Sequence, residues 1–151
     1  MKMPPLEKIP EAYSAIADQR VALGEGRAEV QSSDGRKTYL VEWKGDLYSA
    51  NDNATYWQGY AGYPIIAVLL LQGRLPYIYE DALLFQRINW NALNKAHKNN
   101  YAEALKEVQE GLKKQGVDVE RLNQNLRMIY QALAGLDLKI KRGRLKSVSV
   151  R

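Results

Sequence analysis

Two stretches of alternating residues on either side of a tight turn place the strongest constraint on how this chain folds. Arg27–Ser33 and Arg36–Trp43 flank the pair Asp34-Gly35. Both residues of the pair tolerate positive φ, so the pair suits a two-residue type I′ turn between antiparallel strands. Lys44-Gly45 offers a second tight turn, which leads into Asp46–Ala50. The sequence therefore predicts a three-stranded antiparallel meander, which is stable only if another element covers one face.

Helices are the expected cover. Pro64 precedes Ile65–Leu71, which is apolar on all sides, and Gly73 follows it. The flanking Pro and Gly favour a central buried helix over the alternative, a buried strand. An earlier helix is expected from Pro10 and should end at Gly24 and Gly26. A further short helix is expected over Asp81–Arg87.

The second half of the chain has a helical period. Apolar and aromatic side chains recur at steps of three and four, which predicts one long amphipathic helix ending at Gly116. The members of this stripe are Trp90, Leu93, His97, Tyr101, Leu105, Val108 and Leu112. Asp118 can cap a second helix that runs towards Leu136. Because the linker Gln115–Val117 is short, the two helices should be antiparallel neighbours.

The end of the chain changes period again. After Gly135, Leu138 and Ile140 alternate with lysines, which predicts a terminal strand or hairpin. Taken together, the patterns predict an α+β fold in one domain over residues 1–151, with residues 1–8 as a candidate mobile start. Its expected parts are the three-stranded antiparallel meander, the C-terminal strand or hairpin, the buried helix and an antiparallel two-helix hairpin.

Composition narrows the class of protein. The chain has 151 residues, of which 46% are hydrophobic, so it is long enough for a real core. It has no cysteine, which excludes disulfides, thiol nucleophiles and Cys-ligated zinc. The start of the chain lacks an apolar signal core, and the longest apolar run is too short to span a bilayer. We therefore expect a cytoplasmic protein that is not inserted in a membrane.

All of the net positive charge lies in the last fourteen residues. Of 22 Lys and Arg residues, six are in this segment, which leaves 16 against 17 Asp and Glu elsewhere. The six are Lys139, Lys141, Arg142, Arg144, Lys146 and Arg151. Such a segment can attract nucleic acid through its phosphates. Alternating cations on an edge strand can equally serve to prevent edge-to-edge aggregation.

A loop rich in aromatic residues is the best candidate for a ligand surface. Thr55–Pro64 carries Tyr56, Trp57, Tyr60 and Tyr63. Exposed Tyr and Trp rings can stack on nucleobases, sugars or cations. The alternative is that these rings cover the end of the buried helix and seal the sheet.

The inventory of reactive groups is sparse. His97 is the one histidine, and its place in the apolar stripe favours a half-buried structural role over acid–base catalysis. Glu80-Asp81 has no identifiable carboxylate partner, and a helix N-terminal role explains it better. Asn51-Asp52-Asn53 lacks the remaining ligands of a calcium loop, so turn formation is favoured there and no metal site is expected. No cofactor is expected either.

One short segment resembles a known family. Tyr39-Leu40-Val41-Glu42-Trp43-Lys44-Gly45 is similar to the central strand and turn of chromodomains, which read methylated lysine through an aromatic cage. The resemblance makes Trp43 one cage aromatic. The chain departs from the family pattern after the glycine, where Trp57 comes later than expected and is followed by Gln58-Gly59. The resemblance is therefore confined to one strand and its turn.

Three functions remain open from the sequence. The first is a non-enzymatic binding module, associated with nucleic acid through the basic C-terminal segment and the aromatic loop. The second is a protein-interaction or assembly subunit, which self-associates through uncovered apolar stripes of its helices. The third is a small-molecule enzyme with an aromatic-lined pocket, in which His97 or Glu80-Asp81 is the acid or base.

Overall fold

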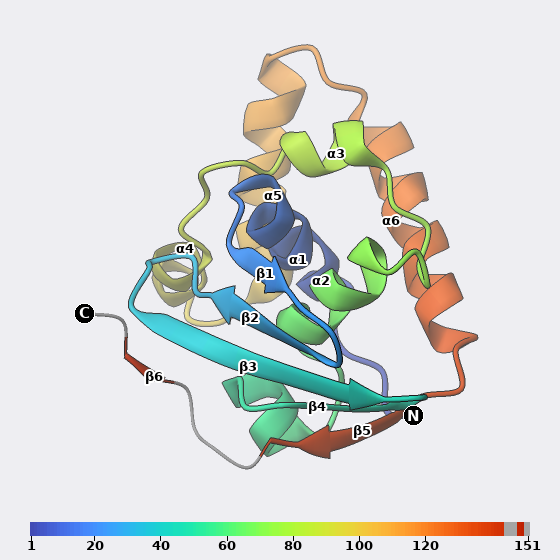
Figure 1. Cartoon of the computed structure of the whole chain (residues 1–151). Coiled ribbons are helices and arrows are strands. Elements are labelled where there is room, and N and C mark those ends of the chain that lie inside the picture. The colour runs from blue at the N-terminus through green and yellow to red at the C-terminus, as the bar shows by residue number, and fades with distance from the viewer. Residues whose placement is uncertain (144–147, 150–151) are drawn as a thin grey trace.

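A mostly antiparallel sheet forms one layer of the structure (Figure 1). The computed structural model describes residues 1–143 and 148–149. The strands are β1 (Val21–Leu23), β2 (Arg27–Gln31), β3 (Lys37–Lys44), β4 (Leu47–Ala50), β5 (Lys139–Arg142) and β6 (Val148–Ser149). Their order is β1-β2-β3-β4-β5, and β6 pairs with the start of β3. Neighbouring strands are antiparallel except β4 and β5, which are parallel.

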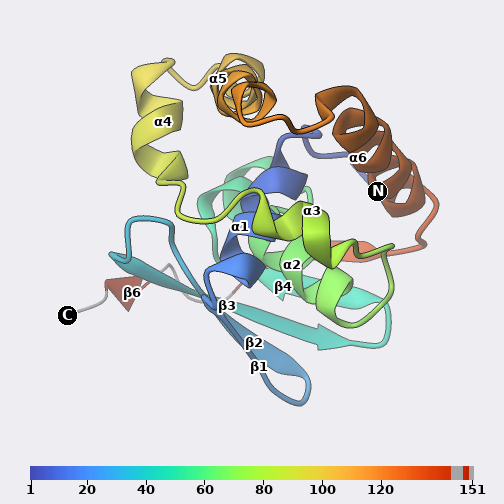
Figure 2. The same cartoon turned by 90° about the horizontal axis from the view of Figure 1, so that it is seen from above.

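Helices form the second layer, and Figure 2 shows α1 and α2 over the sheet with the later helices around them. The α-helices are α1 (Lys8–Ala17), α2 (Tyr63–Leu71), α3 (Tyr79–Leu83), α4 (Trp90–Ala96), α5 (Tyr101–Lys114) and α6 (Val119–Ala134). A short π-helix, η1 (Ala54–Gln58), follows β4 and contacts β5. The predicted α+β class is therefore confirmed. None of the helices within the described ranges has the length and apolar character needed to cross a membrane.

The predicted meander is present, and its inward face is the predicted one. Tyr39 and Val41 of β3 are buried, and Trp43 packs against the core from the same face. The first turn differs from the prediction. The strands stop at Gln31 and resume at Lys37, and of the two predicted turn residues only Gly35 has positive φ, at 73°.

The side chain of Asp34 explains the longer turn. Its Oδ1 accepts hydrogen bonds from Ser32 Oγ at 2.7 Å and from the Arg36 amide at 3.0 Å. These local bonds favour an open loop over a two-residue turn. The hydrogen bond from Ser32 lowers the pKa of Asp34 to about 2, so the carboxylate is charged at neutral pH.

The first helix is shorter than predicted. It ends at Ala17, because Gln19 adopts a left-handed φ of 57° and the Arg20 amide donates to the Ala15 carbonyl at 2.8 Å. This pattern is a Schellman stop, which a non-glycine residue can also form. Val21–Leu23 is consequently strand β1, and the glycines at 24 and 26 belong to the β1–β2 turn.

The predicted long helix is wrong, because the chain breaks it into α4 and α5. Lys98 and Asn99 have left-handed φ values of 53° and 63°, and the Asn99 amide donates to the Asn94 carbonyl at 2.7 Å. Asn100 then starts α5 by accepting a hydrogen bond from the Glu103 amide at 3.2 Å. The apolar stripe thus runs across two helices that meet at an angle (Figure 1).

Three other predicted elements are confirmed. Helix α2 starts at Tyr63–Pro64 and is buried along nearly its whole length, and Gly73 follows it with a φ of 75°. Asp118 caps α6 by accepting from the Arg121 amide at 3.1 Å. Strand β5 is the predicted terminal strand. The helix expected over Asp81–Arg87 lies earlier, as α3.

Candidate functional site

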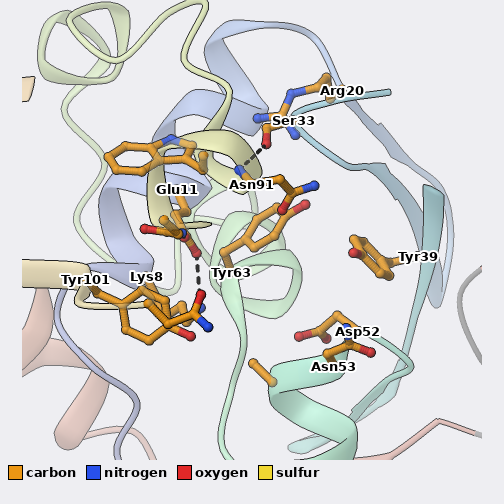
Figure 3. A pocket seen from close by; sticks show the side chains of 14 residues that line it. Lys8, Glu11, Arg20, Ser33, Tyr39, Asp52, Asn53, Tyr63, Asn91 and Tyr101 are labelled. Carbon is orange, nitrogen blue, oxygen red and sulfur yellow. Dashed lines mark hydrogen bonds and ion pairs between the residues drawn. The ribbon is translucent and has the colours of Figure 1, made fainter. Parts of the chain in front are cut away.

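A polar cavity of about 320 Å³ lies between α1, β3, the segment after β4 and the start of α4 (Figure 3). Its walls come from segments between residues 8 and 101, so it exists only in the folded chain. Its lining carries both acids and bases, together with several amide side chains and aromatic rings. This polar cavity is the best-defined candidate site in the described part of the molecule.

One wall is a network from α1, α4 and α5. Lys8 Nζ lies 3.3 Å from Glu11 Oε2, and Glu11 Oε1 accepts a hydrogen bond from Asn94 Nδ2 at 2.8 Å. The Lys8 ammonium also lies over the Tyr101 ring, 4.4 Å from its centroid. Burial by itself lowers the pKa of Lys8, but the Glu11 carboxylate together with Tyr101 and Tyr60 outweighs it, and the pKa is raised. Lys8 and Glu11 therefore neutralise each other.

Asp52 forms the facing wall, and its carboxylate points into the cavity (Figure 3). The side chain is 3% exposed. Its Oδ2 accepts a hydrogen bond from the Thr55 amide at 3.1 Å, whereas its Oδ1 is buried and has no hydrogen-bond partner among residues 1–143 and 148–149. Burial raises the pKa of Asp52, although the hydrogen bonds from Thr55 oppose this. A carboxylate in this environment favours a ligand that brings a proton donor or a positive charge.

Close packing behind Asp52 explains a glycine at the start of α2. A Cβ atom on Gly62 would overlap Asp52 Oδ2 and would lie 2.9 Å from Asp52 Cγ. The Gly62 amide donates to Thr55 Oγ1 at 3.0 Å. Gly62 and Thr55 therefore hold the Asp52 carboxylate in place from behind.

Arg20, between α1 and β1, lies at the upper end of the cavity in Figure 3, beside Ser33. Its Nη1 donates to the Gln31 carbonyl at 2.6 Å, and its side chain is 10% exposed. Its Nε and Nη2 are buried without a hydrogen-bond partner in the described ranges. Asp18 Oδ2 is 3.8 Å from Nε, too far for a hydrogen bond. Nε and Nη2 form the edge of the guanidinium that binds a carboxylate through two parallel hydrogen bonds.

Two tyrosines lie between Arg20 and Asp52 in Figure 3. The rings of Tyr39 and Tyr63 meet edge to face, with centroids 6.2 Å apart. Burial raises the pKa of Tyr39 to about 12 and also raises the pKa of Tyr63. Both hydroxyls therefore keep their protons at neutral pH and can donate hydrogen bonds.

The aromatic residues predicted to form a ligand surface are in different places. Tyr63 lines the polar cavity. Tyr60 is buried, with Lys2 Nζ 5.6 Å from its ring centroid. Tyr56 and Trp57 stack edge to face at 4.7 Å, and Trp57 is 63% exposed. The loop thus supplies one ring to the cavity and two rings to a separate surface.

The basic segment meets this separate surface. The Arg142 guanidinium lies 4.6 Å from the ring centroid of Tyr56 and 6.0 Å from that of Trp57. We call Tyr56, Trp57 and Arg142 the cation–aromatic surface. Lys139 and Lys141 of β5 are also exposed. The other predicted nucleic-acid contacts, Arg144, Lys146 and Arg151, lie outside the residues whose side chains the structure describes.

The residues considered for catalysis lie outside the polar cavity. His97 Nε2 is 3.2 Å from Glu107 Oε1, in the bend between α4 and α5. Asp81 Oδ2 of α3 accepts from Asn125 Nδ2 of α6 at 2.9 Å. Trp43, the residue of the chromodomain resemblance, stacks on Tyr48 with centroids 6.0 Å apart and is half-buried. In the portion of the chain that is described, no group of three His, Cys, Asp or Glu side chains is placed to hold a metal ion.

Sequence reasoning missed most of the cavity. The sequence singled out none of Lys8, Glu11 and Arg20 as site residues, and Asp52 was interpreted as a turn residue. No local signal indicates that Asp52 is buried, because tertiary packing buries it. No local pattern connects it with Lys8 or Arg20, since the tertiary fold brings these segments together.

Comparison with known proteins identifies a family. Residues 1–139 match the family described as uncharacterised conserved protein UCP014422, so the chain belongs to this family. No curated protein and no solved structure matches the chain. All the residues that line the polar cavity fall inside the matched segment, whereas Lys141 and Arg142 follow it.

Proposed function

We propose that this member of the UCP014422 family binds a small polar molecule in the polar cavity. The observation that carries the proposal is that two residues on its wall, Asp52 and Arg20, have buried polar atoms with no partner in the described residues. A buried polar atom without a partner costs about 1–3 kcal/mol. A ligand that supplies the missing hydrogen-bond partners removes this cost, which favours its binding.

The size of the cavity supports a small ligand. Its volume of about 320 Å³ is at the lower end of the range for metabolite sites. Because the unpartnered atoms are shielded from water, a ligand reaches them only after it turns an adjacent wall side chain aside. Asn53 and Asn91 are exposed residues of the lining, and their side chains can move at low cost.

Blocking the mouth of the cavity tests the proposal. The purified protein is dialysed against a defined mixture of polar metabolites, and the retained compounds are identified by mass spectrometry. Asn91→Trp places a large ring at an exposed lining position of α4, and Ala92→Trp places the same ring on the same helix outside the lining. We expect the wild type and Ala92→Trp to retain the same compound. The amount of this compound that Asn91→Trp retains should be at least tenfold lower. Retention of no compound, or equal retention by Asn91→Trp, refutes the proposal.

A second candidate function uses the cation–aromatic surface, which we propose as a contact for single-stranded nucleic acid. An arginine beside an exposed Trp ring combines a phosphate contact with a stacking platform. This candidate is the first of the three functions predicted from the sequence. A cytoplasmic location remains a prediction, as does self-association of the chain.

Fluorescence anisotropy with a labelled 15-mer of deoxythymidine at two salt concentrations tests this second function. Base stacking contributes about 1–3 kcal/mol per base, so Trp57→Ala should weaken binding about 5- to 150-fold. Arg142→Ala should weaken binding and reduce its salt dependence, whereas Arg127→Ala, at an exposed position of α6, should do neither. No binding at low salt, or equal effects of the two arginine substitutions, refutes it.

A further inference from the structure

Asp52 and Arg20, two wall residues of opposite charge, have buried polar atoms that lack a hydrogen-bond partner within the described residues, although Asp18 Oδ2 lies 3.8 Å from Arg20 Nε. Lys8 and Glu11 form an ion pair with each other at 3.3 Å. Asp52 Oδ1 has no hydrogen-bond partner, and the guanidinium edge of Arg20 has none either, within residues 1–143 and 148–149. One end of the cavity therefore favours a cation and the other end favours an anion.

The two charges lie at different ends of the cavity. Figure 3 shows Arg20 beside Ser33 at one end and Asp52 beside Asn53 at the other, with Tyr39 and Tyr63 between them. A ligand that reaches both must carry its charges apart from each other. The tyrosine rings offer an apolar surface for the part of the ligand that joins them.

From this arrangement, and on the basis of the proposed function, we infer that the polar cavity binds a linear zwitterion. Its carboxylate lies on the Nε–Nη2 edge of Arg20, its ammonium lies on Asp52, and a chain of several carbon atoms separates the two groups. The ligand class is thus that of the ω-amino carboxylates, in which the charged groups stand at opposite ends of a hydrocarbon chain.

Charge and geometry favour this class over neutral sugars. A sugar hydroxyl can bond to Asp52 or to the asparagines of the lining, but it is neutral and brings no charge to either buried group. A planar carboxylate accepts from both free donors of Arg20 at once. An ammonium supplies the positive charge that a buried carboxylate lacks. Raised by burial, the pKa of Asp52 falls again when an ammonium binds, so ligand binding should release protons at a pH near that pKa.

A homologous series of probes tests the inference. Isothermal titration calorimetry compares glycine, 4-aminobutyrate, 5-aminovalerate and 6-aminohexanoate, together with the alkanoate and the alkylamine of each length. We expect affinity to reach a maximum at one of the longer amino carboxylates. Glycine, and the matched alkanoate and alkylamine, should each bind at least tenfold more weakly than that compound.

Two substitutions assign the ends of the ligand. Asp52→Asn keeps the shape of the side chain but removes its charge. It should therefore weaken the binding of the best amino carboxylate at least tenfold and leave the affinity for the matched alkanoate unchanged. Arg20→Lys keeps the positive charge but removes the two-donor edge of the guanidinium, so it should weaken the binding of both compounds. If Arg20→Lys does not fold, the probe series and Asp52→Asn still decide the question.

The results separate this inference from the proposed function. Binding of no amino carboxylate, or equal binding of glycine and the longer compounds, overturns the ligand class. If dialysis then shows that the wild type retains a neutral compound that Asn91→Trp does not retain, the cavity still has its proposed function. If dialysis shows no retained compound, both the ligand class and the proposed function are wrong.

Discussion

At the scale of single residues, Asp52 combines deep burial with an oxygen that finds no partner in the described chain. Thr55 and Gly62 fix its position from behind, so it cannot turn away to find another donor. Charged groups that are buried in this way usually destabilise a fold unless they serve binding or catalysis. The free energy of unfolding of the protein should therefore depend on whether Asp52 is ionised.

Asp52→Asn should change how stability depends on pH. Burial raises the pKa of Asp52 above its ordinary value of 3.8, so the folded state holds this proton at a pH where the unfolded state has lost it. The contribution of Asp52 to the free energy of unfolding therefore falls as pH rises above about 4, and it is lowest above the folded-state pKa. Asp52→Asn has no carboxyl group to ionise at this position, so its free energy of unfolding does not fall in this way. Its stability relative to the wild type should therefore increase with pH.

Urea denaturation of both proteins at several values between pH 4 and pH 8 measures this difference. Other titrating groups are common to the two proteins, so their effects cancel in the comparison. A difference that stays constant across this range would mean that Asp52 has an ordinary pKa in the folded protein.

The residues of the polar cavity show what a sequence pattern can and cannot predict at this scale. Tyr63 was singled out as one ring of the aromatic loop, and it does line the cavity. Glu11 and Asp52 were not, because charge in a sequence indicates exposure and only the packing around these residues buries them. Their burial depends on contacts with segments far away in the chain, which periodicity does not contain.

At the scale of elements, local signals predicted the strands and helices where those signals were strong. The turns at Gly35 and Gly45 fixed the meander, and the flanking Pro and Gly fixed α2. The break between α4 and α5 was missed because the apolar stripe continues through it. Asn100 followed by Glu103 is a recognisable helix start, and it was the signal that could have revealed the break.

The break between α4 and α5 predicts a stabilising substitution. Lys98 is exposed and has a φ of 53°, a conformation that costs a non-glycine residue about 1–2 kcal/mol. Glycine adopts it without this cost but gains freedom in the unfolded chain, so Lys98→Gly should raise the free energy of unfolding by up to about 1 kcal/mol. Thermal and urea unfolding measure the change.

Lys106→Gly is the matched control, because Lys106 is exposed in the middle of α5. There, glycine should lower the free energy of unfolding by about 1 kcal/mol. If both substitutions destabilise the protein equally, Lys98 does not occupy a left-handed conformation in solution.

At the scale of the whole molecule, a small buried network joins the helices to one another. Ser14 Oγ donates to the Phe85 carbonyl at 2.5 Å and accepts a hydrogen bond from Trp90 Nε1 at 2.8 Å. The three residues belong to α1, the segment after α3 and the start of α4. One hydroxyl thus satisfies two buried polar groups from parts of the chain that are more than 70 residues away.

Ser14→Ala should therefore destabilise the whole fold. The substitution leaves the Trp90 indole N–H and the Phe85 carbonyl buried without this partner, which costs about 1–3 kcal/mol. A double-mutant cycle with Trp90→Phe separates the hydrogen bond from the packing of the ring, and we expect a coupling between the two sites. Additive effects on the free energy of unfolding would show that the Ser14–Trp90 bond contributes nothing.

The parallel pairing of β4 with β5 has a consequence for the growing chain. Leu47 pairs with Lys139, and all the helices from α2 to α6 come between them. During synthesis, the first hairpins can form long before β5 leaves the ribosome. Until then, the main-chain amides and carbonyls along one side of β4 lack their hydrogen-bond partners. An unpaired strand edge of this kind can pair with a neighbouring nascent chain. Translation speed through the helical half, or a chaperone that shields this edge, should thus affect the yield of native protein more than it affects the stability of the finished molecule.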